Sequence, residues 1–117
     1  MSTLNVSNIT DGTDTVGTSY VLNGSAKAWV NFNGTGTIAT RDSFNVSSLT
    51  DNATGNYTVN LTSSMSAASY SIATGGDNYH TASYHVNAGS FTVFKYSAAH
   101  TNDDASYVFA SIDGDLA

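Results

Sequence analysis

The chain has 117 residues with no cysteine and no proline, and only 10% of its residues are charged. This length suits one domain with its own hydrophobic core, and the lack of cysteine excludes disulfides and thiolate metal sites. Nine acidic residues against three basic ones give a net charge of −6. Nucleic acids and anionic membrane surfaces are therefore not expected as partners, because binding phosphates requires clustered cations.

The N-terminal segment, Met1 to Ser7, contains neither a basic stretch nor an apolar run. We therefore expect no signal peptide, and synthesis in the cytoplasm of the producing cell. No stretch of the sequence approaches the roughly 18 apolar residues of a membrane-spanning helix, so membrane insertion is not expected. We expect residues 1–25 to form leader strands that can serve as an attachment arm, and residues 26–117 to form the folded core of a single β domain.

Apolar and polar residues alternate with a period of two along most of the chain, which places one set of side chains on each face of a β-strand. Turn-forming residues, such as Asp11-Gly12 and Asn23-Gly24, separate these runs at intervals of roughly ten to fourteen residues. No segment has a helical stripe, and residues 63–68 offer at most one helical turn. The clearest alternating runs cover residues 4–9, 26–33, 44–48, 57–62, 91–96 and 107–112.

This pattern predicts an all-β fold, namely an antiparallel β-sandwich or a jelly-roll-like barrel of about eight strands. The sequence does not fix the strand order, so sandwich and barrel both remain open. We expect a core that contains Leu4, Val30, Phe32, Val46, Val59, Leu61, Ile72, Val93 and Phe109.

The last two predicted strands carry apolar side chains on both faces. Phe91 and Val93 alternate with Phe94 and Tyr96, and residues 107–112 are similar. A strand of this kind either lies in the centre of a sheet or is covered by another chain. Both interpretations stay open at this point.

Chemistry-bearing residues show no catalytic pattern. The sequence has no glutamate and no Gly-x-Ser-x-Gly motif, so we expect no enzyme activity and no cofactor. His80, His85 and His100 are too scattered to predict a metal site. The aspartates of Asp11 to Asp14, Asp103-Asp104 and Asp113 to Asp115 do not have EF-hand spacing, and turns favour aspartate for backbone reasons.

Aromatic side chains are the remaining candidates for ligand binding. Trp29 lies on the face opposite to Ala28 and Val30, and Tyr79, His80 and Tyr84 follow a glycine-rich turn. These four residues are candidate surface positions for binding a carbohydrate such as a host-surface glycan. The alternative is that the large aromatic residues belong to the core or to a subunit interface.

Two consecutive segments carry a resemblance to a known family. Ala28 to Ala39 has the sequence AWVNFNGTGTIA, and Arg41 to Leu61 has the sequence RDSFNVSSLTDNATGNYTVNL. Together they resemble a module of tail-fibre-like and other virion proteins of tailed bacteriophages, especially marine and cyanobacterial ones. The pattern in that module is WVNFNGTGT followed by SYNVSSITDNGTGDYTVNF. Here Phe44, Leu49 and Asn56 replace its tyrosine, isoleucine and aspartate.

The resemblance is specific over residues 28–62, weaker through Tyr70 to Gly76, and also present in the leader from Leu4 to Gly12. It implies two hairpins, one turning at Asn33 to Gly36 and one at Asp51 to Asn56, where Gly55 is free to take a positive φ. It transfers no catalytic residue. It also implies an external structural protein of a virion, assembled as a homotrimer with tail or capsid proteins as partners. Tail fibre, head fibre and capsid decoration protein remain open, as does a free carbohydrate-binding module.

Overall fold

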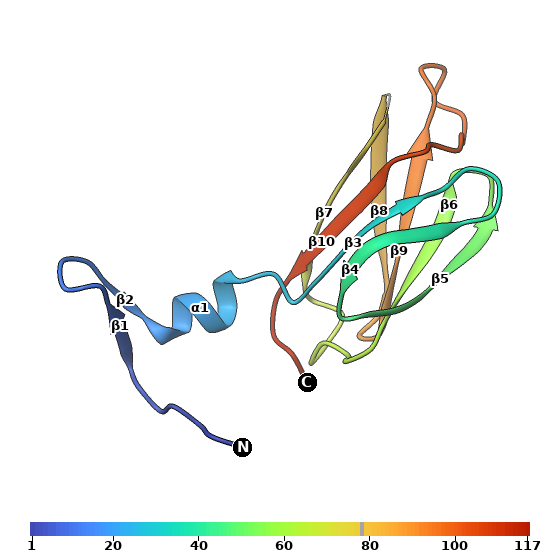
Figure 1. Ribbon diagram of the computed structural model, residues 1–117. Coiled ribbons are helices and arrows are strands. Elements are labelled where there is room, and N and C mark those ends of the chain that lie inside the picture. The colour runs from blue at the N-terminus through green and yellow to red at the C-terminus, as the bar shows by residue number, and fades with distance from the viewer. Residues whose placement is uncertain (78) are drawn as a thin grey trace.

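The computed structural model describes the backbone at residues 1–77 and 79–117, and the side chains at these positions except 85 and 86. Its ten strands and one helix are arranged as an N-terminal arm and a sandwich (Figure 1). The elements in chain order are β1 (Asn8–Thr10), β2 (Thr15–Gly17), α1 (Thr18–Gly24), β3 (Ala28–Asn33), β4 (Ala39–Phe44), β5 (Val46–Ala53), β6 (Asn56–Leu61), β7 (Ser71–Gly76), β8 (His80–Asn87), β9 (Ser90–Tyr96) and β10 (Val108–Asp113).

Two antiparallel four-stranded sheets form the sandwich, with strand orders β4-β3-β10-β7 and β5-β6-β9-β8. The pairs β3-β4, β5-β6 and β8-β9 are hairpins within one sheet, and the other connections cross between sheets. The predicted antiparallel sandwich is therefore confirmed. Its sheets hold eight strands, and a separate hairpin of β1 and β2 brings the described total to ten.

The core lies between the two sheets, because alternate side chains of the central strands point inward. Of the residues expected there, Val30, Phe32, Val59, Leu61 and Val93 are buried, and Val46 and Ile72 are partly buried against the core. The predictions for Leu4 and Phe109 are wrong, since 83% and 46% of their respective surfaces are exposed. Leu4 lies in the arm, and Phe109 is on the outer side of β10, whose inner side is formed by Val108, Ala110 and Ile112.

The last two strands are central in their sheets. β9 lies between β6 and β8, and β10 lies between β3 and β7. The interpretation that such strands lie in the centre of a sheet therefore accounts for the positions of both β9 and β10. A central position does not explain why the outer side of β10 carries Phe109, because no described residue of this chain covers that ring fully.

The alternation of residues 44–48 indicated one strand, but the structure divides this segment between β4 and β5. Asn45 has a φ of 58°, and the chain turns there from β4 in one sheet to β5 in the other. Asparagine tolerates this left-handed conformation better than most residues. Its side-chain amide donates to the carbonyls of Lys27 and Ser63, at 3.1 and 3.0 Å, and its Oδ1 accepts from the Ser63 N–H at 2.7 Å.

The two predicted hairpins are present with different loops. β5 and β6 are joined by Thr54 and Gly55 alone, and Gly55 has the expected positive φ, at 62°. β3 and β4 are joined by a longer loop, residues 34–38, in which Gly36 has a φ of 59°.

The N-terminal arm, residues 1–24, projects from the sandwich as the β1-β2 hairpin followed by α1 (Figure 1). It contributes to molecular extents of 51 × 28 × 24 Å. The helix α1 was not expected, because Thr18, Tyr20 and Val21 favour strands and no side chain caps its start. Every arm residue is exposed except Gly17 and Thr18, which are partly exposed. Among the described residues, no helix is long and apolar enough to cross a membrane.

Candidate functional site

The four predicted binding residues do not form one site. Trp29 lies in the β4-β3-β10-β7 sheet, and His80 and Tyr84 lie in the β5-β6-β9-β8 sheet. Tyr79 immediately precedes β8. All four side chains are exposed, so the expectation of surface positions fits each residue separately.

The most prominent surface feature is the aromatic face, which we define as Trp29, Phe44, Tyr107 and Phe109 on the outer side of the β4-β3-β10-β7 sheet. Their exposed fractions are 39%, 55%, 47% and 46%. Trp29 on β3 pairs with Phe44 on β4 and with Ser111 on β10, so these three side chains form a transverse row. Phe109 lies in the next row, opposite Asn31 on one side and Gly75 on the other.

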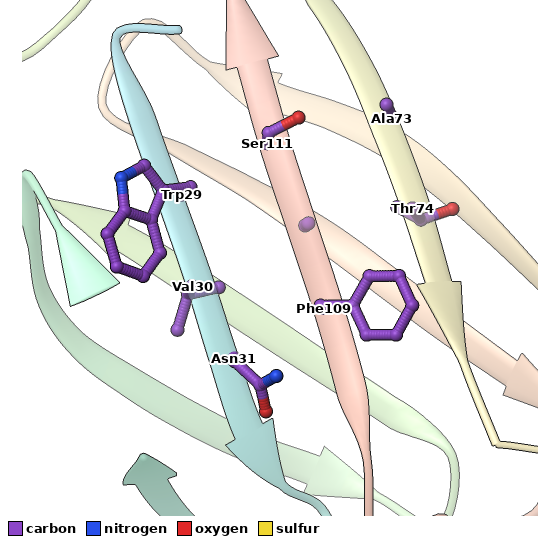
Figure 2. Close-up of a pocket in the computed structure, with 8 residues that line it drawn as sticks. Trp29, Val30, Asn31, Ala73, Thr74, Phe109 and Ser111 are labelled. Carbon is purple, nitrogen blue, oxygen red and sulfur yellow. The ribbon is translucent and has the colours of Figure 1, made fainter. Parts of the chain in front are cut away.

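A shallow groove of about 420 Å³ runs across this face (Figure 2). Trp29 lies on its β3 side, and the ring of Phe109 leans towards β7 (Figure 2). A side chain at Gly75 would collide with that ring, since a Cβ there would lie 2.6 Å from Phe109 Cζ. The outward residues between the two aromatic rings are small or neutral, namely Asn31, Ala73 and Ser111.

One cation lies at the edge of the aromatic face. The guanidinium of Arg41 lies 3.8 Å from the centroid of the Tyr107 ring, and its Nη1 donates to Asn31 Oδ1 at 3.4 Å. The other two basic side chains, Lys27 and Lys95, are buried, and their Nζ atoms donate to backbone carbonyls. Arg41 is thus the exposed member of the three Lys and Arg side chains.

Sequence reasoning found Trp29 but missed the rest of this face. Phe109 was assigned to the core, and Phe44 and Tyr107 were not recognised as surface residues. The sequence signal that could have revealed this face is that residues 107–112 are apolar on both sides of the strand. That pattern indicates a covered outer surface but does not identify the other residues in it.

The outer side of the other sheet differs. Tyr84 packs edge-on against Phe94 at 5.2 Å between ring centroids, and Phe94 stacks with Tyr96 at 6.2 Å. Its β5-β6 half is a polar ladder, in which Asn52 and Asn60 donate to hydroxyl and amide oxygens of neighbouring side chains at 2.8–3.2 Å. These polar groups already pair with one another, as is typical of a solvated sheet surface.

The histidines and aspartates do not gather into a metal site in the described part of the chain. The rings of His80 and His100 stack at 4.5 Å, and the side chain of His85 lies outside the described residues. Asp11 accepts from the N–H groups of Asp14 and Thr13, at 2.8 and 2.9 Å. These hydrogen bonds lower the pKa of Asp11, and they give this aspartate a structural role in the β1-β2 turn.

A second pocket of about 590 Å³ lies where the arm joins the sandwich. Val21 and Leu22 of α1 line it from one side, and Phe44 and Leu116 line it from the other. Apolar surface thus continues from the aromatic face through Phe44 to the arm.

These surfaces offer aromatic rings and neutral hydrogen-bonding groups, which are common at contact surfaces of proteins. Comparisons of the chain with protein-family models, with curated proteins and with solved structures found no match.

Proposed function

We propose that this protein is a non-enzymatic, external structural component of a bacteriophage virion, tail-fibre-like and assembled as an oligomer. In this proposal residues 1–24 attach the protein to its neighbours in the particle, and the sandwich is displayed outward, where it can contact the host surface. The resemblance of residues 28–62 to virion modules supports the class of protein. The observation that carries the proposal is the arm, which exposes apolar side chains and buries none.

The arm needs a partner for physical reasons. A two-stranded hairpin is marginally stable in water, and a seven-residue helix is shorter than isolated helices that persist there. Leu4, Val6 and Ile9 nevertheless line an apolar groove together with Val21 and Leu22 of α1. Burying a side chain of this size yields about 1.5–3 kcal/mol, so a partner that fills the groove stabilises the arm.

A head fibre or capsid decoration protein is the alternative within the same class, because an attachment arm serves either position. A second alternative, outside the class of virion proteins, is a free carbohydrate-binding module. In that module the exposed aromatic residues that bind the carbohydrate would be Trp29, Tyr79, His80 and Tyr84. A module of that kind is expected to be monomeric and to need no docked arm.

Immunogold electron microscopy on particles from a lysate of the encoding phage tests the proposal directly. Label on the tail supports a fibre, and label over the head supports a capsid fibre or decoration protein. Particles without label contradict the virion assignment and favour the free binding module.

A matched pair of variants then tests the arm. In Leu4→Lys/Val6→Lys the two apolar side chains become charged, and we expect the label on particles to disappear. Ser2→Lys/Thr13→Lys adds the same charge at exposed arm positions that do not line the groove and should keep the label. Equal labelling with both variants would show that apolar contacts of the arm do not attach the protein.

A further inference from the structure

The aromatic face is a large exposed apolar surface in the centre of a folded sheet. Its residues come from β3, β4 and β10 and from Tyr107 just before β10, so strand pairing holds them in fixed positions. Contiguous apolar patches of this kind mark interaction sites on soluble proteins. Aromatic side chains are enriched and charged ones depleted at the centres of protein interfaces, and none of the residues lining the groove between Trp29 and Phe109 is charged.

The two outer surfaces of the sandwich are therefore unequal. On one surface, Asn, Ser and Thr side chains of β5 and β6 satisfy one another by hydrogen bonds, and the rings of Tyr84, Phe94 and Tyr96 on β8 and β9 pack against one another. On the opposite surface, aromatic rings stand beside small residues such as Ala73 and Ser111. This asymmetry singles out one surface for a contact that removes it from water.

We propose that the aromatic face is where the protein associates with a second copy of itself. The face is complementary to itself in shape, since it presents protruding rings at Trp29 and Phe109 next to the small side chains of Ala73 and Ser111. In a two-fold contact the rings of each copy fit over the small residues of the other, as isologous interfaces require. This inference rests on the oligomeric assembly in the proposed function, assigns a surface to it, and specifies a two-fold contact in place of the homotrimer that the resemblance implies.

The charges on this face are complementary between two copies although the whole chains repel. The chain carries a net charge of −6, so two copies repel unless they meet where carboxylates are few. Arg41, the exposed basic side chain, lies on this face beside Asp42. In a two-fold contact Arg41 of each copy can lie near Asp42 of the other, which complements charge across the interface and fixes its register.

The single tryptophan of the chain makes this surface directly observable, because Trp29 is part of it. We would measure the mass of the full-length protein by sedimentation and the emission of Trp29 from micromolar to near-millimolar concentration. We expect a mass that rises above the 12.1 kDa of one chain. The emission should move to shorter wavelength over the same concentrations, since association removes the indole from water.

Two variants perturb the face and keep the reporter. Phe109→Lys places a charge in the contact, and Arg41→Asp reverses the exposed cation. We expect Phe109→Lys to weaken association by about 30-fold, as for a residue at the centre of an interface, and Arg41→Asp, at the edge of the face, to weaken it by about tenfold. Tyr84→Lys is the matched control, because it makes the same kind of change at an exposed ring on the opposite surface and should associate like the wild type. Circular dichroism and thermal melting confirm that each variant is folded, and Arg41→Asp carries the test if Phe109→Lys does not fold.

A monomer at every concentration would overturn the inference. It would also be overturned if both variants associated as the wild type does, since assembly would then use another surface such as the arm. A shift of Trp29 emission on adding soluble oligosaccharides, without a change of mass, would assign the face to a glycan instead. Immunogold label on particles is independent of these results, so a labelled virion with a monomeric protein would contradict this inference and the oligomeric assembly, and would leave the virion assignment intact.

Discussion

The hydroxyl of Tyr57 donates to Oδ1 of Asp104 across 2.7 Å, which ties β6 to the connection between β9 and β10. The same carboxylate oxygen accepts the N–H of Gly55 at 2.8 Å, and the Tyr57 hydroxyl also lies 3.0 Å from the carbonyl oxygen of Gly34. Three loops therefore meet at one end of the sandwich around one fully buried phenol. The ring itself packs edge-on against Phe32, with centroids 5.2 Å apart.

Replacing Tyr57 by phenylalanine should keep the packing and lose these hydrogen bonds. Asp104 Oδ1 keeps the N–H of Gly55 but loses the phenol as a donor, and the loss of a hydrogen bond to a carboxylate costs about 1–3 kcal/mol of unfolding free energy. Urea unfolding monitored by circular dichroism measures the loss. Tyr79→Phe, at an exposed ring, is the control and should leave the midpoint unchanged. Equal midpoints for both variants would show that the network around Asp104 does not stabilise the fold.

Stability should fall at alkaline pH because of two buried phenols. Burial, and then the hydrogen bond to Asp104, raise the pKa of Tyr57 above its ordinary value, and burial likewise raises the pKa of Tyr70. The unfolded chain releases these protons from about pH 10 upward while the folded protein keeps them. The unfolded state then binds fewer protons, so the unfolding free energy decreases as pH rises, by up to about 1.4 kcal/mol per pH unit for each tyrosine.

Urea midpoints measured between neutral pH and pH 11 test this dependence. Tyr57→Phe removes one of the two groups and should decline less steeply than the wild type above pH 10. Parallel curves for the two proteins would contradict the contribution of Tyr57.

Gly55 and Gly36 provide a matched pair for loop strain. Both have left-handed backbones, with φ of 62° and 59°. A Cβ at Gly55 would lie 2.5 Å from the carbonyl oxygen of Lys95 and 2.6 Å from the amide nitrogen of Asp103, whereas a Cβ at Gly36 meets nothing within 4 Å. Gly36→Ala should cost about 1–2 kcal/mol for the backbone alone, and Gly55→Ala should cost clearly more. Thermal melting of both variants decides the comparison, and a similar loss in each would refute the close approach at Gly55.

Asn45 combines a backbone role with a side-chain role at the corner between the sheets. Asn45→Ala loses three hydrogen bonds and keeps a disfavoured φ, so we expect a loss of about 2–4 kcal/mol. Asn45→Gly loses the same hydrogen bonds but relieves the backbone, and should be less damaging by about 1 kcal/mol. Chemical unfolding of both variants separates the backbone role from the side-chain role. Equal unfolding free energies of Asn45→Ala and Asn45→Gly would show that the positive φ at this corner does not lower stability.

Local chemistry alone predicted much of the sandwich. The alternation in residues 28–33 placed Trp29 outward and Val30 and Phe32 inward, since successive side chains of a strand must point to opposite faces. Gly55 was expected at a positive φ because its hairpin needs one. The spacing of such strands and turns indicated an antiparallel sandwich or barrel, and the structure decided for the sandwich.

Long-range relationships were not predictable from the same pattern. Asn45 fits a strand in sequence, and only the pairing of β4 and β5 with different partners makes it a corner. α1 contains residues that favour strands, and neither a capping side chain nor a helical stripe marked it in the sequence.

The sequence by itself determined which side chains alternate and where the chain can turn, because both depend on neighbouring residues. Only the tertiary structure decided which face of β10 is buried. Tyr107 and Phe109 lie on one side together with Ser111, and Val108, Ala110 and Ile112 lie on the other, so the two large aromatic residues make the outer side a candidate for the core as well. The facing sheet selects the side with the smaller residues for the core, and this choice leaves Phe109 beside Trp29 on the aromatic face.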